Sequence, residues 1–211
     1  MSNDVVVEPG LAYALADFVP PIAHLDFETI APAIPVWPGC RPYDAVPVQF
    51  SCDIERGPRL EHHEWLAEGP GDPREAFAKA LIAAVRGART IVVYNEGFEI
   101  ARMRELADAV PHLAGRLESV IERVVDLLPV VRAYVYHPAF GGSFGLKAVA
   151  PALVPTIGYD ALEIADGNLA SKQLEALLLR GDEMITAERR RLRRALLAYC
   201  ALDTAATLAV V

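Results

Sequence analysis

The chain has 211 residues, 53% of them hydrophobic, and carries 20 Lys and Arg against 28 Asp and Glu for a formal net charge of −8. This length suits one globular domain with a proper core, and the hydrophobic content excludes a disordered chain. The acidic balance argues against broad electrostatic adhesion to nucleic acid, but it suits a site for divalent cations. We expect a single domain over residues 1–211.

The sequence gives no sign of export or membrane insertion. Pro20 and Pro21 interrupt the most apolar N-terminal run, which rules out a spanning helix there. The first residues include Asp4 and Glu8 and no basic segment of the kind that opens a signal peptide. The three cysteines show neither metal-type spacing nor a disulfide framework. A cytoplasmic protein without membrane contact is expected.

Hydrophobic periodicity and turn residues predict alternating strands and helices. The predicted strands cover residues 22–28, 46–54, 59–65, 90–94 and 124–126. The predicted helices run from Asp72-Pro73 to about residue 86, over residues 97–109, and over residues 186–210, with the rest of the C-terminal half mostly helical. Three early strands, a helix, a strand and a helix indicate an α/β domain with a mixed sheet of five strands flanked by helices.

The first of three acidic motifs lies on the predicted strand at residues 22–28. Residues two apart in a strand point to the same side, so Asp26 and Glu28 project together while Leu25 and Phe27 face the other way. An ordinary strand end with solvated acids gives the same pattern. Alone, this motif is weak evidence for a functional site.

The second motif is Asn95-Glu96-Gly97-Phe98-Glu99, at the start of a predicted helix. Glu99 heads an apolar stripe that continues through Met103, Leu106 and Val110, so it should face the core. The alternative is a first-turn acid favoured by the helix dipole and paired with Arg102.

The third motif places Tyr199 and Asp203 one turn apart on the last helix. The stripe that contains them is Leu192, Leu196, Tyr199, Asp203, Ala206 and Val210. Burying an unpaired carboxylate costs several kcal/mol, so Asp203 requires a partner, either a cation or one of the many arginines. Tyr199 and Asp203 can reach the same point.

Four carboxylates from separate elements suit a site for two Mg²⁺ or Mn²⁺ ions, which prefer oxygen ligands. Two such ions about 3.5–4 Å apart activate water and stabilise charge during phosphodiester hydrolysis. A tyrosine with a pKa near 10 is a poor base at neutral pH, so Tyr199 is assigned to orienting the attacking water.

These motifs resemble those of the DEDD exonuclease superfamily, in its tyrosine subclass, on a ribonuclease H-like fold. That superfamily has D-x-E on the first strand, an N-x-x-F-D-like second motif and Y-x-x-x-D on a late helix. The resemblance covers about residues 22–207 and implies a catalytic set of Asp26, Glu28, Glu99, Tyr199 and Asp203. Asp26, Glu28 and Asp203 would hold one metal, Asp26 would bridge to the second, and Glu99 would act near it. Glu99 stands where the superfamily usually has Asp.

A closer resemblance is to a bacterial family of unknown function that is often fused to a RecB-like nuclease domain. It rests on residues 25–29, on residues 93–95 with 98–99, and on residues 142–149. A stand-alone version or an excised domain is expected, with a partner nuclease domain or a homo-oligomer as the protein partner. The residues expected to bind substrate are Phe27, Thr29, Asn95, Phe144 and Lys147.

Three further features have both structural and functional interpretations. Lys147 follows a Gly-Gly-Ser loop and begins a helix, where it is either a phosphate contact or a solvated lysine. Asp126 caps a helix or supports the acidic site. The arginines between residues 189 and 194 either follow a nucleic-acid backbone or form a solvated helix face.

The sequence thus predicts a metal-dependent 3′–5′ exonuclease that releases nucleoside monophosphates from single-stranded DNA or RNA. Phe27 or Phe144 would stack on the terminal base. The main rival is a catalytically weak module that keeps the fold and binds nucleic acid or a protein. A phosphoesterase with another substrate class is a third candidate.

Overall fold

A computed structural model describes residues 4–211. Five strands form one mixed sheet in the order β4-β3-β2-β5-β6. The strands are β2 (Ile22–Ile30), β3 (Val46–Arg56), β4 (Arg59–Leu66), β5 (Thr90–Val93) and β6 (Val124–Asp126). β2, β3 and β4 are antiparallel neighbours, whereas β5 and β6 run parallel to β2. The predicted α/β architecture with a mixed five-stranded sheet is confirmed.

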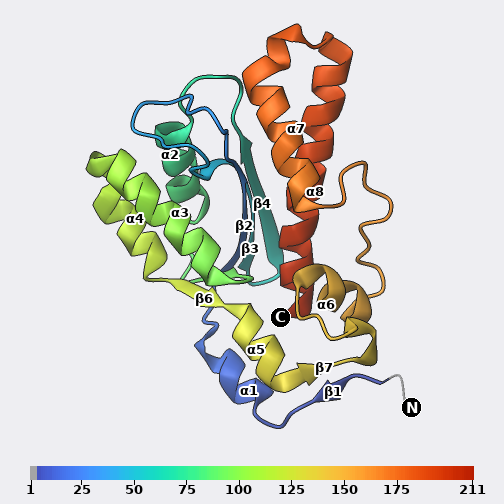
Figure 1. The fold of residues 1–211 in the computed structure, drawn as a ribbon. Helices are drawn as coiled ribbons and strands as arrows, with labels where there is room; N and C mark the ends of the chain where they lie inside the picture. Colours follow the sequence, from blue (N-terminus) through green and yellow to red (C-terminus); the bar gives the residue numbers. More distant parts are fainter. Residues whose placement is uncertain (1–3) are drawn as a thin grey trace.

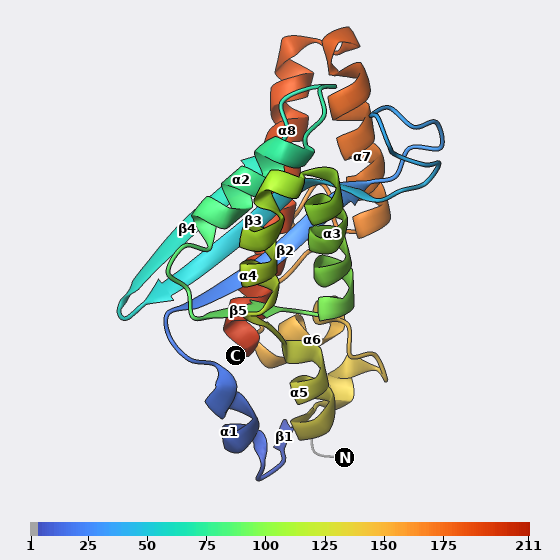
Figure 2. The same cartoon turned by 90° about the vertical axis from the view of Figure 1, so that its left-hand side faces the viewer.

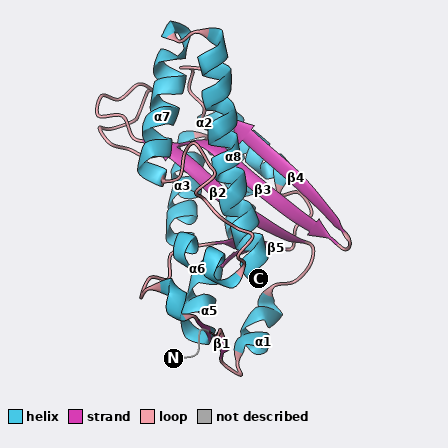
Figure 3. Ribbon diagram, turned by 90° about the vertical axis from the view of Figure 1, so that its right-hand side faces the viewer, coloured by secondary structure: helices cyan, strands magenta, loops and turns pink. Residues whose placement is uncertain are grey.

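Helices cover both faces of this sheet (Figure 1). One face packs against α2 (Arg74–Ala84), α3 (Glu96–Ala109) and α4 (Ala114–Ile121), which lie together in Figure 2. The other face carries α6 (Leu146–Leu153), α7 (Gly167–Arg180) and the long α8 (Thr186–Val210), seen in front of the sheet in Figure 3. The long predicted helix over residues 186–210 has these bounds in the structure.

Smaller elements extend the chain beyond one end of the sheet. They are β1 (Val6–Val7), α1 (Leu11–Ala14), α5 (Leu127–Tyr134), β7 (Val135–Tyr136) and the 3₁₀ turns η1 (Leu15–Asp17) and η3 (Pro138–Phe140). Two further 3₁₀ turns, η2 (Pro111–Leu113) and η4 (Gly181–Glu183), join α3 to α4 and α7 to α8. β1 pairs with β7 in a separate two-stranded sheet that the sequence did not predict. No helix within residues 4–211 is long and apolar enough to cross a membrane.

The two faces of β2 have different characters because its side chains alternate. Ala23, Leu25 and Phe27 enter the core beneath α2, α3 and α4, where Phe27 and Phe77 pack edge to face with ring centroids 5.2 Å apart. His24, Asp26 and Glu28 occupy the opposite set of positions, toward α8. The register of β2 against β3 shifts between Glu28 and Thr29, because Glu28 pairs with Gln49 and Thr29 with Pro47. Val48 is therefore the extra residue of a bulge beside the acidic pair.

α8 lies across β2 and β3 through its predicted stripe. Leu192, Leu196, Tyr199, Asp203 and Ala206 are all buried. Leu192, Leu196 and Tyr199 join the core between α7, α8 and the sheet. The Gln49 side chain donates a hydrogen bond from Nε2 to the carbonyl of Leu196 at 2.8 Å, which ties the middle of α8 to β3. This contact fixes the helix just before the turn that carries Tyr199 and Asp203.

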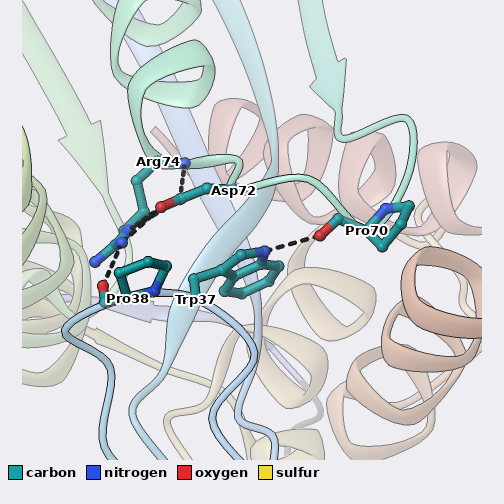
Figure 4. A network of polar contacts seen from close by, with 5 residues as sticks. All are labelled: Trp37, Pro38, Pro70, Asp72 and Arg74. Atoms are coloured by element: carbon teal, nitrogen blue, oxygen red, sulfur yellow. Dashed lines mark hydrogen bonds and ion pairs between the residues drawn. The ribbon is translucent and has the colours of Figure 1, made fainter.

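A polar network holds the long loop that follows β2 (Figure 4). Trp37 donates from its indole Nε1 to the Pro70 carbonyl at 2.9 Å. Arg74 donates to the Pro38 carbonyl at 2.8 Å and pairs with Asp72 at 2.6 Å. The loop is thus attached to the start of α2. Pro73 is the residue before the first helical position rather than the first helical residue predicted from sequence.

Candidate metal centre

Three carboxylates from β2 and α8 meet between the sheet and the helix. One oxygen atom from each of Asp26, Glu28 and Asp203 lies within 4.8 Å of the other two. The two strand residues share a face because of the period of two, and the helix residue is directed at them by the buried stripe. The predicted convergence of these three acids is therefore present in the structure.

Burial and mutual repulsion disfavour the charged forms of all three acids. Burial, followed by the nearby charges of Asp203 and Glu28, raises the pKa of Asp26 well above its usual range. Burial and the Asp203 charge raise the pKa of Glu28 to about 8. Burial also raises the pKa of Asp203, against the opposing effects of Tyr159, Lys147 and Tyr199. Such a cluster is stabilised by a bound cation, which favours the ionised carboxylates.

Asp203 has no arginine partner, although the sequence left that alternative open. Only 7% of its surface is exposed, and no ion pair joins it to an arginine within the described residues 4–211. Its Oδ1 atom is fully buried and accepts no hydrogen bond from the described residues. An unpaired buried carboxylate oxygen is costly, so this atom is a position where a hydrogen-bond donor or a cation would be stabilising.

Glu99 lies apart from the three clustered acids but within electrostatic reach of Asp26. It is buried at the first turn of α3, with its predicted stripe of Met103, Leu106 and Val110 also buried. Burial, followed by the charge of Asp126, raises the pKa of Glu99 to about 8, and its Oε2 atom has no hydrogen-bond partner among the described residues. The alternative pairing with Arg102 is wrong, because Arg102 pairs with Glu105.

The approach of Glu99 to Asp26 follows from the short β5 strand. β5 pairs with β2 only from Ile22 to His24 within the described chain, so Asp26 lies beyond the last paired residue. The chain then turns at Asn95, which has a left-handed φ of +83° that Asn tolerates better than most residues. Because the chain turns at Asn95, α3 begins at the end of β5, and its first helical turn lies toward β2.

Asp126 supports that turn. Its Oδ1 accepts hydrogen bonds from the backbone N–H of Leu128 at 2.9 Å and from that of Asn95 at 2.8 Å. The predicted capping of a helix, α5, is confirmed, and the second contact links the ends of β5 and β6. Asn95 is exposed, and its structural role is the turn itself.

Lys147 reaches the acidic cluster from the first turn of α6. Its Nζ atom donates to the Tyr199 hydroxyl at 2.5 Å and to the Ala165 carbonyl at 3.2 Å. Its charge lowers the pKa values of Glu28 and Asp203 against the stronger effect of burial. Lys147 stays exposed to solvent, as the solvated-lysine alternative expected, and its ammonium group also contacts the site.

Tyr159 is a member of the site that no pattern in the sequence indicates. It lies in the loop between α6 and α7, at right in Figure 1, and only 8% of its surface is exposed. Its ring centroid is 5.2 Å from Lys147 Nζ, and its hydroxyl group lies beside Asp203. Loops without periodicity give no signal for a buried tyrosine. Cys200 was also missed: its Sγ lies 3.7 Å from Asp26 Oδ2.

Three of the expected substrate-binding residues have other positions or contacts. Phe27 is buried in the opposite core, so the expectation that it stacks on a base is corrected: no ring face is free. Phe144 is partly buried against Phe140, and its carbonyl accepts a hydrogen bond from Tyr94 at 2.6 Å. The carbonyl of Thr29 accepts a hydrogen bond from the Ser171 hydroxyl at 2.8 Å.

The arginine run on α8 has mainly intramolecular partners. Arg189 pairs with Asp182, Arg191 pairs with Glu163, and Arg193 donates to the carbonyls of Leu66 and Ala67. These contacts favour the structural interpretation of the run. A cavity of about 770 Å³ lies between the loop after β2 and the C-terminal half of α3, and no carboxylate of the cluster lines it.

A comparison with protein families identifies one match. The family described as "Domain of unknown function (DUF2779)" matches residues 23–145, more than half of the chain. The chain belongs to this family. The matched span includes Asp26, Glu28 and Glu99, whereas Tyr199 and Asp203 follow it. No curated protein and no solved structure matches the chain.

Proposed function

We propose that this member of the family is a metal-dependent 3′–5′ exonuclease that hydrolyses single-stranded DNA or RNA to nucleoside monophosphates. The observation that carries the proposal is the meeting of three carboxylates from β2 and α8, with one oxygen of the buried Asp203 lacking any described partner. An ordinary structural acid would have a donor at that oxygen. A hard divalent cation such as Mg²⁺ or Mn²⁺ fits the all-oxygen ligand set.

The sheet supports the proposal at the level of the fold. We propose that the sheet is ribonuclease H-like. This rests on the antiparallel group of β2, β3 and β4, which the parallel strands β5 and β6 extend. The acidic pair lies on β2, the central strand, and a C-terminal helix supplies the third acid from one face. This matches the order of motifs in the tyrosine subclass of DEDD exonucleases.

Each residue has a role that its position allows. Asp26, Glu28 and Asp203 would hold one cation, and Glu99 would act at a second ion bridged by Asp26. When bound, the two ions would supply charge stabilisation at the attacking and leaving oxygens and would acidify the attacking water. Tyr199 is not a general base, because burial and the surrounding carboxylates raise the pKa of its hydroxyl. Its hydroxyl instead orients the water by hydrogen bonding.

The surrounding residues support nuclease chemistry rather than broad nucleic-acid binding. The net charge of −8 disfavours a passive binding protein, whereas Lys147 brings one positive charge to the acidic cluster. Phe144, in the loop just before α6, remains the aromatic candidate for contact with the terminal base. The three free cysteines agree with the proposed cytoplasmic location.

The position of Glu99 favours a second candidate, a catalytically weak module that binds nucleic acid or a protein partner. Glu99 lies outside the group of three acids, so the second ion has a less complete ligand set. A protein partner would be a nuclease domain or a second copy of the chain. Activity decides between the two candidates, because only the enzyme shortens its substrate.

The test uses single-stranded DNA and RNA labelled at the 5′ or the 3′ end, incubated with Mg²⁺ or Mn²⁺. We expect a ladder of 5′-labelled products and early release of the 3′-terminal nucleotide, both abolished by chelation. Asp203→Asn is expected to lower the rate at least about 1,000-fold, as loss of a metal ligand does in such sites. Glu55→Gln, which removes a half-exposed acid from the neighbouring strand, is the matched control. Retained binding without cleavage by the unmutated protein would favour the binding module.

A further inference from the structure

The ammonium group of Lys147 is held between two tyrosine rings. Its Nζ atom lies 4.5 Å from the centroid of Tyr199 and 5.2 Å from that of Tyr159. The faces of aromatic rings attract cations, and the Lys147 side chain keeps its exposure to solvent while it makes these contacts. The two tyrosines come from α8 and from the loop between α6 and α7, so three separate segments meet at this ammonium group.

The hydrogen bonds of Lys147 leave part of its capacity unused. An ammonium group has three N–H donors. One bonds to the Tyr199 hydroxyl at 2.5 Å and another to the Ala165 carbonyl at 3.2 Å. One donor therefore remains, next to a cluster of acids that repel any anion by themselves. A substrate phosphate can approach such a cluster only where positive charge is present.

The bond from Lys147 also determines what the Tyr199 hydroxyl can do. Because this oxygen accepts a hydrogen bond from the ammonium group, its own proton is free to be donated toward Asp203 or an ordered water. The Tyr159 hydroxyl is buried beside the Asp203 carboxylate, which is the polar side chain that it faces. The ring of Tyr159, rather than its hydroxyl, makes its contact with Lys147.

We propose that Lys147 is the binding group for a non-bridging oxygen of the substrate phosphate, and that Tyr159 is a positioning residue that holds Lys147 against Tyr199. The inference rests on the proposed nuclease function and specifies which groups receive the phosphate. The ligand class is a phosphodiester, or the phosphomonoester of a released nucleoside monophosphate. Tyr159 acts through Lys147 and does not touch the phosphate itself.

The test combines a double-mutant cycle with a conservative variant. Lys147→Met is expected to lower kcat/KM by about 10- to 100-fold, the usual effect of losing one charge-assisted hydrogen bond. Tyr159→Leu removes the ring and should lower kcat/KM about 5- to 10-fold, whereas Tyr159→Phe keeps the ring and should stay within about twofold of the unmutated enzyme. The variant with Lys147→Met and Tyr159→Leu should be no slower than Lys147→Met alone, because Tyr159 acts through Lys147.

Thermal unfolding and Mn²⁺ titration of each variant show whether it folds and keeps its cation. Additive losses in the double variant, or a Lys147→Met enzyme with unchanged kcat/KM, would overturn the inference while leaving the nuclease function intact. If the unmutated protein cleaves nothing, binding of thymidine 5′-monophosphate in the presence of Mn²⁺ takes the place of kinetics. Binding weakened by Lys147→Met would then support the phosphate site without the nuclease, and binding unaffected by that substitution, or absent, would overturn the phosphate site as well.

Discussion

Asp203 is the residue whose surroundings explain most of the candidate centre. It is buried on α8, faces two acids of β2, and is contacted by tyrosines and a lysine rather than by an arginine. Three acids in one place repel each other, so they lower the stability of the folded state unless a cation joins them. Under the proposed function, the three acids lower the stability of the metal-free protein and provide the ligands for a cation.

Replacing Asp203 with Asn should separate those two properties. Asn keeps the shape but removes one of the repelling charges, so the melting temperature of the metal-free protein should rise by about 2–4 °C, equivalent to about 1 kcal/mol in a chain of this size. The affinity for Mn²⁺ should fall by roughly two orders of magnitude, or about 3 kcal/mol. Calorimetric unfolding and titration measure the two effects. A metal-free variant that melts well below the unmutated protein would indicate a structural role for Asp203.

The raised pKa values predict an unusual dependence of stability on pH. Glu28 and Glu99 each have an ordinary pKa of 4.5 and a pKa of about 8 in the folded protein. Between pH 4.5 and about pH 8, these two carboxyl groups keep protons in the folded state that they have released in the unfolded state. The folded state is therefore most stable below pH 4.5 and loses stability as the pH rises toward 8. The metal-free protein should therefore melt about 5 °C or more lower at pH 8 than at pH 5.

Added Mn²⁺ should reverse this trend, because ionised carboxylates are the forms that bind it. The stabilisation by Mn²⁺ should be larger at pH 8 than at pH 5. Thermal unfolding at both pH values, with and without chelator, provides the measurement. A metal-free melting temperature that rises from pH 5 to pH 8 would contradict the pKa assignments.

At the scale of single elements, the position of α3 determines how close Glu99 lies to the three clustered acids. The helix begins where β5 has ended, and its first turn brings the Glu99 carboxylate within electrostatic reach of Asp26. If the backbone distance is matched to Glu, then Glu99→Asp, although it restores the usual residue of the resembled superfamily, should reduce kcat about 10-fold. Glu99→Gln should reduce kcat further and leave the first Mn²⁺ site filled. A faster Glu99→Asp enzyme would show that Glu99 is a defect rather than an adapted ligand.

The two faces of β2 carry different kinds of side chain, so a substitution on the apolar face should affect stability rather than substrate binding. Phe27 lies in the aromatic core with Phe77, away from Asp26 and Glu28. Phe27→Leu should cost about 1 kcal/mol of unfolding free energy through lost packing, with KM for single-stranded DNA unchanged. Denaturant unfolding and steady-state kinetics test both parts. A several-fold increase in KM without loss of stability would restore Phe27 as a substrate contact.

The sequence predicted the parts of the molecule whose burial follows a regular period. The five strands, α3 and α8 were recognisable from periods of two and of three to four, and the same periods placed Glu99 and Asp203 on buried faces. Alternation in β2 also placed Phe27 opposite Asp26, which argued against its assignment to substrate. The contacts of Lys147 with two tyrosines could not be predicted, because they depend on a long loop folding back over α8.

At the scale of the whole molecule, the two sides of the sheet differ in the polarity of their buried residues. The α2, α3 and α4 side has a continuous apolar core, whereas the α8 side combines apolar packing around Leu196 with buried polar residues such as His24, Ser51 and Asp53. Several of these polar atoms have no hydrogen-bond partner among the described residues. The apolar core beneath α2, α3 and α4 supports a rigid sheet. This rigid sheet allows the α8 side to hold acids that oppose folding.

The metal centre is tested most directly by a crystal structure of the protein grown with Mn²⁺, with anomalous diffraction used to locate the ion. We predict a peak between Asp26, Glu28 and Asp203, with carboxylate oxygens at about 2.0–2.3 Å from the ion. A second peak on the Glu99 side of Asp26 is predicted when a nucleoside monophosphate is also bound. Full-occupancy Mn²⁺ elsewhere in the crystal, with none among the three carboxylates, would show that these acids do not form a metal site.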